Sequence, residues 1–277
     1  MVFGINEVLF ALSLSLLAGL ATGVGSFLAF FAKRTNTRFL SLALGFSAGV
    51  MIYISFVEIF PSGRELIITD FGSKLGLMIA VAAFFGGIAL AALIDRLLPH
   101  CENPHEFHQL DDMGHGGCRR HRHHHLECQK LFRLGILVAV ALAIHNFPEG
   151  LATFFGALNN IHFGIMIAVA VAIHNIPEGM AVSIPVYYAT GSKRQAFLYS
   201  FFSGLAEPVG ALVGYLVLSP FLNNTILGIV FAAIAGVMIF ISLDELLPAA
   251  EEYGEHHLVI YGLIAGMAVM ALSLLLC

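Results

Sequence analysis

The sequence predicts an all-α membrane protein with eight transmembrane helices. Three observations predict this class: 58% of the 277 residues are hydrophobic, only 11% are charged, and eight stretches are long and apolar enough to span a bilayer. With a mean hydropathy of +0.88, the chain carries more apolar surface than one water-soluble core can bury. The bilayer is therefore the expected solvent for the excess.

A spanning helix needs about 20 mostly apolar residues. The stretches that meet this requirement are 8–31, 39–60, 75–98, 131–157, 163–189, 196–219, 225–247 and 257–277. They place helices 1–3 within 1–98 and helices 4–8 within 131–277, separated by a loop at 99–130, in a single membrane domain. The first stretch lacks a basic leader and a small-residue cleavage site, so we expect it to belong to the mature fold.

The distribution of Lys and Arg predicts the orientation. If both termini are extracytoplasmic, eleven of the thirteen basic residues fall in cytoplasmic loops or at cytoplasmic helix ends, and only Arg64 and Lys74 fall outside. Cytoplasmic loops carry the excess of positive charge, and an even number of helices agrees with termini on one side. Because the basic residues form no stripe and the net charge is −5, nucleic acid is not an expected partner.

An internal repeat is the second organising feature. The run AGVMIYISFVEIFP at 48–61 matches AGVMIFISLDELLP at 235–248 in nine of fourteen positions, with an offset of 187. Gly19, Leu20, Ala21, Val24 and Gly25 recur as Gly204, Leu205, Ala206, Val209 and Gly210, with an offset of 185. Helices 1 and 2 thus resemble helices 6 and 7, which cross in the opposite sense. The pattern favours the inverted repeat of secondary transporters over chance similarity between apolar helices.

Two polar motifs lie near the middle of adjacent predicted helices, HNFPEG at 145–150 and HNIPEG at 174–179. Helical spacing places His145, Asn146 and Glu149 on one face of helix 4, and His174, Asn175 and Glu178 repeat this arrangement on helix 5. Ionisable residues at that depth are costly unless they face a partner, an ion or a water-filled cavity. They are therefore the main candidates for a functional site.

Further groups add to this candidate site. Pro148 and Pro177 displace the carbonyls of Ile144 and Ile173, which could then bind an ion or water. Helix 6 supplies a third acid, Glu207. A lone intramembrane His or Glu would more often be a hydrogen-bonded contact between helices, but two copies of the motif and a third acid favour a metal site. Imidazole and carboxylate ligands suit Zn²⁺, Fe²⁺ and Mn²⁺, and the lack of a nearby thiolate argues against Cu(I).

The paired motifs, together with PVYYATGSKR at 185–194, resemble the ZIP family of divalent metal transporters over essentially all eight helices. This resemblance implies a binuclear centre, uptake of zinc into the cytoplasm across the cytoplasmic membrane of a prokaryote, and sliding of helices 1, 4, 5 and 6 against the others. It implies one site formed by His145, Glu149, His174 and Glu178, and a second formed by Asn146, Asn175 and Glu207 with Glu149 and Glu178 bridging. Glu207 aligns with Thr22 in the repeat, so we expect the second site to be asymmetric.

Two peripheral groups of residues are weaker candidates. Glu58 is expected near the outer surface, and Asp244 and Glu245 near the inner surface, where they would attract cations or cap helix ends before Pro61 and Pro248. The loop at 99–130 holds eight of the thirteen histidines and has a composition typical of disorder. Its candidate metal contacts are His121, His123, His124 and His125. Such tracts bind metal without fixed geometry, and a solvated linker is the alternative.

Several functions are compatible with these features. The chain has no GxxxxGK[ST] phosphate loop, so we expect a carrier that does not hydrolyse ATP. An intramembrane zinc-dependent hydrolase would keep an open coordination position and a spare carboxylate, and HExxH is missing. A metal-gated channel is the third alternative. We expect no enzymatic activity and no organic cofactor, with Zn²⁺ as the transported substrate and Fe²⁺, Mn²⁺, Co²⁺ and Cd²⁺ as compatible ions. The oligomeric state stays open, a homodimer included.

Overall fold

The computed structural model describes residues 4–30, 37–97, 124–253 and 256–276, and all regular elements in these ranges are helical. The α-helices are α1 (Ile5–Ala29), α2 (Thr37–Ile54), α3 (Phe60–Phe71), α4 (Ser73–Leu97), α5 (His124–Asn159), α6 (Ile161–Thr190), α7 (Lys193–Gly204), α8 (Ala206–Leu218), α9 (Asn224–Ile241), α10 (Leu247–Tyr253) and α11 (His256–Leu276). Two π-helical segments, η1 (Ser55–Ile59) and η5 (Ser242–Leu246), and a 3₁₀ turn, η4 (Ser219–Phe221), connect them. The helical class is therefore confirmed.

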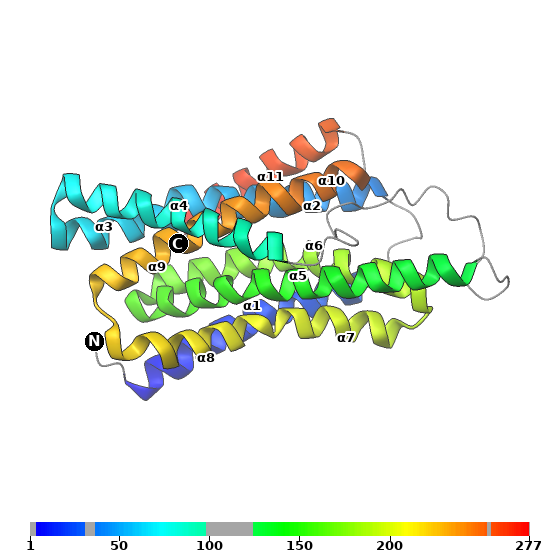
Figure 1. The fold of residues 1–277 in the computed structure, drawn as a ribbon, viewed down its shortest axis with the longest axis horizontal. Helices are drawn as coiled ribbons and strands as arrows, with labels where there is room; N and C mark the ends of the chain where they lie inside the picture. Colours follow the sequence, from blue (N-terminus) through cyan, green and yellow to red (C-terminus); the bar gives the residue numbers. More distant parts are fainter. Residues whose placement is uncertain (1–3, 31–36, 98–123, 254–255, 277) are drawn as a thin grey trace.

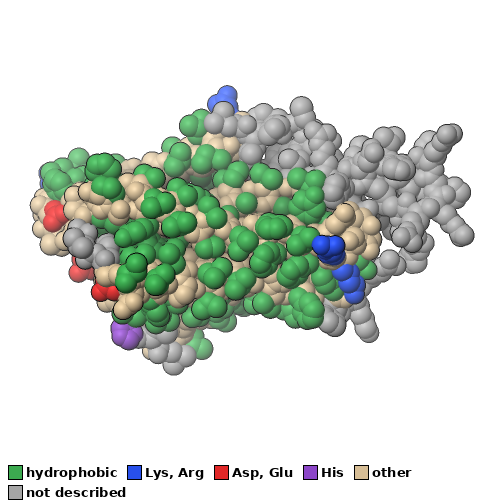
Figure 2. All heavy atoms as spheres, turned by 90° about the horizontal axis from the view of Figure 1, so that it is seen from below, with side chains coloured by type: hydrophobic (Ala, Val, Ile, Leu, Met, Phe, Trp, Pro, Cys, Tyr) green, Lys and Arg blue, Asp and Glu red, His purple; other side chains and the backbone are tan. Residues whose placement is uncertain are grey.

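Seven stretches of the described helices are long and apolar enough to cross a membrane. They are 5–29, 41–71, 73–96, 161–184, 193–221, 224–251 and 256–275, and they correspond to all the predicted spans except the fourth. The fourth predicted span, 131–157, lies within the 36-residue helix α5. Several side chains of α5 lie outside the described part of the chain, so this span stays a prediction. Figure 2 shows hydrophobic side chains over the middle of one face and charged side chains toward its ends. The chain is a multi-pass helical membrane protein.

The second and seventh spans run further than predicted. The sequence predicts ends at 60 and 247, but α2, η1 and α3 form one span, as do α9, η5 and α10. In each case a π-helical segment ends two residues before the proline, with the N–H of Phe60 donating to the Ser55 carbonyl and that of Leu247 donating to the Ser242 carbonyl. Pro61 then occupies the first turn of α3, where a missing N–H costs little.

The helices form two groups that lie side by side in Figure 1. We call α1, α5, α6, α7 and α8 the central bundle, and α2, α3, α4, α9, α10 and α11 the outer bundle, because each set packs mainly within itself. Between the bundles, α2 packs on α6, and α5 packs less extensively on α9. α1 begins and α11 ends toward the same end of the long axis (Figure 1), while the side of the membrane that this end faces stays a prediction.

Within the central bundle, helices approach closely where both sequence motifs end. A Cβ atom on Gly150 would collide with the Glu207 carbonyl, and one on Gly179 would collide with the Thr22 carbonyl. Small residues allow backbones to approach in this way inside membranes. The glycine of each HNxPEG motif therefore fixes its helix against α8 or α1, beside the polar side chains of the same motif.

Structural elements repeat at the offset seen in the sequence. α2 begins and ends 187 residues before α9, and η1 begins and ends 187 residues before η5. The packing repeats as well, since α2 lies against α11 and α9 lies against α4. The two matching stretches of sequence therefore adopt the same succession of an α-helix, a π-helical segment and a proline-led helix.

Candidate metal centre

The α5–α6 hairpin brings the two polar motifs together. Asn160 caps α6, and its side-chain oxygen accepts hydrogen bonds from the N–H groups of His162 and Phe163. The chain therefore reverses direction within one residue after α5 ends. Both helices then continue past Pro148 and Pro177. The ion-binding role of the Ile144 and Ile173 carbonyls stays a prediction.

All seven candidate ligands of the central bundle are buried. Their side chains belong to α5 (His145, Asn146 and Glu149), α6 (His174, Asn175 and Glu178) and α8 (Glu207), and none exposes more than 1% of its surface. Charged groups are almost never buried to this extent unless they are paired or bind an ion. The burial points to a compensated polar centre.

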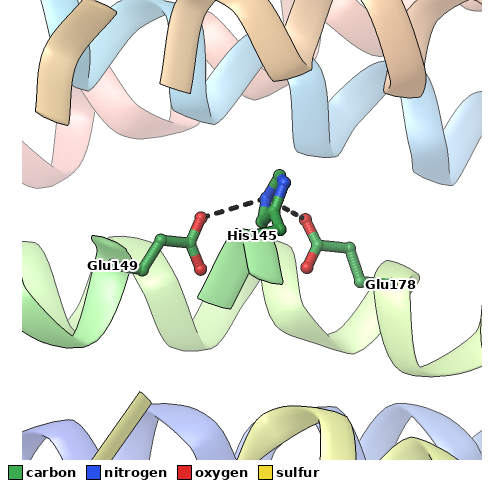
Figure 3. Close-up of side chains that lie close together, drawn as sticks. All are labelled: His145, Glu149 and Glu178. Atoms are coloured by element: carbon green, nitrogen blue, oxygen red, sulfur yellow. Dashed lines mark ion pairs between the residues drawn. The ribbon is translucent and has the colours of Figure 1, made fainter. Parts of the chain in front are cut away.

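Two histidines and two glutamates form the core of this centre. The His145 Nε2 atom lies 3.2 Å from Glu149 Oε1 and 3.5 Å from Glu178 Oε1, so its ring stands between the two carboxylates (Figure 3). The His174 Nε2 atom lies 3.0 Å from Glu149 Oε1. Ligand atoms from His145, Glu149 and Glu178 all lie within 4.8 Å of one another, a spacing that can hold one metal ion.

The two asparagines are oriented by backbone carbonyls. The Asn146 Nδ2 atom donates to the Ser203 carbonyl at 3.2 Å, and the Asn175 Nδ2 atom donates to the Ala18 carbonyl at 3.0 Å. Asn175 also donates to the Glu207 carboxylate. Because the NH₂ groups are engaged in this way, both Oδ1 atoms are left as acceptors without a hydrogen-bond partner.

The unpaired atoms of the centre have the chemistry of metal ligands. Oxygens of Glu149, Glu178 and Glu207 and both asparagine Oδ1 atoms are buried without a hydrogen-bond donor. Buried polar atoms without a partner are costly, and three carboxylates in a low-dielectric site need compensating cations. A divalent ion would satisfy the oxygens and the charge together, so these residues fit a metal.

Comparison with known proteins identifies the family. The family model described as "ZIP Zinc transporter" matches residues 7–274. The chain belongs to the ZIP family. Zinc transporter ZupT of Nitratidesulfovibrio vulgaris is 60% identical over 271 residues, which cover 98% of each chain. Zinc transporter ZupT of Clostridium perfringens is 55% identical over 98% of this chain and 97% of its own, and that of Streptococcus mutans is 55% identical over 96% and 97%.

The peripheral acids of this ZIP chain do not join the central cluster. Glu58 lies half-buried in η1, and exposed Asp244 and half-buried Glu245 lie in η5. The helical spans continue past all three residues, so the expectation that they cap helix ends is wrong. Attraction of cations at two pathway mouths stays a prediction.

The histidine tract lies mostly beyond what the structure describes. His121 and His123 are outside the described residues, whereas His124 and His125 begin α5 and only their backbone is described. The helix that contains the predicted span 131–157 therefore begins seven residues before it. Disorder and metal contact in the loop stay predictions.

Sequence reasoning missed one side chain that touches the centre of this ZIP protein. The buried hydroxyl of Ser47, on α2 of the outer bundle, lies within hydrogen-bond distance of Glu178 Oε1, at 3.4 Å, and of the His174 carbonyl, at 3.3 Å. A serine in an apolar helix belongs to no motif. Only the packing of α2 on α6 reveals the contact.

Proposed function

We propose that this chain carries divalent transition-metal ions, zinc foremost, across the cell membrane into the cytoplasm through the buried centre on α5, α6 and α8. One observation carries this proposal: seven ligand-type side chains from three membrane helices converge without exposure, and several of their oxygens lack a partner. The relatives, which are zinc transporters at 55–60% identity, support zinc as the substrate. Iron, manganese, cobalt and cadmium are compatible with the same ligand chemistry.

The ligands divide into two adjacent sites in this proposal. His145, Glu149, His174 and Glu178 form the first site, and Asn146, Asn175 and Glu207 form the second, with Glu149 and Glu178 bridging. The contacts of both imidazoles with Glu149 support the first site. The contact of Asn175 with Glu207 and the unpaired amide oxygens support the second.

The inverted repeat supplies the transport mechanism. Asn146 and Asn175 are 29 residues apart, and they donate to the carbonyls of Ser203 and Ala18, which are 185 residues apart. Such exchanged contacts are expected if a pseudo-two-fold axis relates predicted helices 1–3 to predicted helices 6–8, and α5 to α6. They support the inversion that the sequence repeat predicts.

A second pair of contacts repeats the same exchange. The Ser15 hydroxyl donates to the Gly150 carbonyl at 3.2 Å, and the Ser200 hydroxyl donates to the Gly179 carbonyl at 3.2 Å. We infer that the central bundle moves as a unit against the outer bundle and exposes the centre to each side in turn. The central bundle corresponds to predicted helices 1, 4, 5 and 6, which are α1, α5, α6 and α7–α8. These are the helices that the family resemblance expects to slide.

A carrier needs neither an organic cofactor nor a catalytic step, and we propose neither for this chain. A hydrolase would use a glutamate as general base on metal-bound water. Here Glu149 and Glu178 each contact a histidine inside the cluster, an arrangement suited to holding an ion. Assembly as a homodimer, with the bilayer and metal ions as the other partners, stays a prediction.

Zinc uptake into proteoliposomes loaded with a zinc-sensitive dye tests the function. Wild-type protein should give saturable uptake, and His145→Ala or Glu178→Ala should abolish it. His162→Ala is the matched control, because His162 is an exposed histidine in the first turn of α6. Uptake that survives loss of either ligand would exclude the proposed centre, and unitary currents would favour a channel.

A further inference from the structure

The contact between Ser47 and Glu178 links the two bundles at the metal centre. Ser47 belongs to α2 of the outer bundle, whereas Glu178 belongs to α6 of the central bundle. Both residues are completely buried. The Ser47 hydroxyl lies 3.3 Å from the His174 carbonyl and 3.4 Å from Glu178 Oε1, the same carboxylate oxygen that lies 3.5 Å from His145 Nε2. One carboxylate oxygen is thus held from both bundles, and the second, Oε2, has no hydrogen-bond partner.

The repeat does not reproduce this contact. At the offset of 187, the counterpart of Ser47 is Ile234 on α9, and at the offset of 29 the counterpart of Glu178 is Glu149 on α5. Ile234 is a buried apolar residue of the core. It has no hydroxyl to donate, so the outer bundle can hold a ligand carboxylate through one half of the repeat and not through the other.

We propose that Ser47 is a state-selective positioning residue: its hydroxyl holds Glu178 in the conformation described here and has no counterpart in the opposite conformation, where Ile234 takes the equivalent place. This inference rests on the alternating movement proposed above. If the repeat is inverted, the opposite conformation exchanges the roles of its halves, so α9 packs closely on α5 and α2 withdraws from α6. A contact formed in one state only shifts the equilibrium by its own free energy.

The expected size of the effect follows from hydrogen-bond energetics. A hydrogen bond to a charged group that is made in one state and lost in the other changes the ratio of two states by about tenfold or more. A partner that orients a metal ligand also changes metal affinity, by about 10-fold to 100-fold in other proteins. Removal of the Ser47 hydroxyl should therefore populate the opposite state and weaken zinc binding.

Distances between spin labels on the two bundles test the state preference. Labels replace Glu65 on α3 and Gln195 on α7, both exposed, in full-length protein whose four cysteines are changed to serine. Metal-free wild type should give one dominant distance. Ser47→Ala should add a second distance population, raised about tenfold over wild type, while Ser47→Thr, which keeps a donor, should resemble wild type.

The repeat partner provides a matched gain-of-contact experiment. Ile234→Ser supplies a hydroxyl to the opposite state and should raise the second population, whereas Ile234→Ala removes the same apolar side chain without a donor. Equal populations in wild type and Ser47→Ala, or in Ile234→Ser and Ile234→Ala, would overturn the proposal.

Zinc affinity, measured by titration calorimetry on the same Ser47 variants, separates hydrogen bonding from packing. Ser47→Ala should raise the Kd for Zn²⁺ about tenfold. Ser47→Thr should keep a Kd close to that of wild type. An equal loss in both variants would assign the effect to packing and overturn the positioning role. Zinc uptake by wild-type protein is scored separately, so this inference can fail while the proposed function stands.

Discussion

At the residue scale, the centre combines strong and weak ligands. In the proposed centre, imidazole and carboxylate groups at the first site suit Zn²⁺, whereas the amide oxygens of Asn146 and Asn175 at the second would be weaker ligands, held in place by backbone carbonyls. A carrier must release its ion as well as bind it. We therefore expect the two sites to differ in affinity, with the second weaker because its only acid of its own is Glu207.

Replacement of Glu207 by glutamine tests the second site. Glu207→Gln keeps the size of this buried side chain and removes its charge, so the second ion should lose most of its binding energy. We expect zinc stoichiometry, measured by elemental analysis after equilibrium dialysis, to fall from two ions per chain to one. A stoichiometry of two in the variant would show that Glu207 is not a ligand.

Zinc binding should weaken as pH falls. Imidazole and carboxylate ligands bind metal in their deprotonated forms, so protons compete with the ion and are released when it enters. Titration calorimetry at pH 7.5 and pH 6.0 should show a higher Kd at the lower pH. Titrations in two buffers of different ionisation enthalpy should reveal proton release, and a Kd independent of pH would contradict ligation by the histidines.

At the element scale, close contact between helices positions the ligands. Gly150 and Gly179 each end a polar motif and each lie against a backbone carbonyl of a neighbouring helix. The contact leaves no space for a methyl group. Because the neighbour is backbone, relief requires a shift of the whole helix and of the ligands one residue away, Glu149 or Glu178.

Gly179→Ala should therefore destabilise the protein and impair the centre. Overpacking of this kind costs about 1–3 kcal/mol, which should appear as a lower Tm in detergent and as weaker zinc binding. Gly86→Ala on α4 is the matched control, because a Cβ there would meet nothing within 4 Å and alanine favours helix. Equal melting temperatures for the two variants would contradict the packing argument.

Much of the element structure could be predicted from the sequence because apolar length decides where helices span. The predicted ends of the second and seventh spans, at 60 and 247, were wrong, because the helices continue past Pro61 and Pro248. The π-helical segments η1 and η5 accommodate these prolines instead, and they depend on tertiary packing. The ligand pattern was visible because HNxPEG occurs twice, whereas Ser47 reaches Glu178 only through the contact of α2 with α6.

At the scale of the whole molecule, two bundles meet mainly where α2 packs on α6. The central bundle holds every proposed ligand, and the outer bundle lies along one side of it (Figure 1). This division is suited to alternating access, because the ion can travel with its ligands. The repeated succession of α2 and η1 in α9 and η5 would give the outer bundle two equivalent surfaces for the two end states of the proposed movement.

The histidine tract should modulate transport rather than carry it. Replacement of His121, His123, His124 and His125 by alanine keeps the length of the chain and leaves the central ligands intact. We expect zinc uptake into proteoliposomes to keep most of its initial rate. Complete loss of uptake would place these residues on the transport path.

X-ray absorption of zinc-loaded protein tests the central claim most directly. The centre predicts a shell of nitrogen and oxygen ligands at about 2.0–2.2 Å, with the outer scattering of imidazole, and the imidazole contribution should disappear in the His145→Ala, His174→Ala double variant. A zinc–sulfur shell at about 2.3 Å, or imidazole scattering unchanged in the double variant, would contradict the account, because the metal would then be bound elsewhere in the chain.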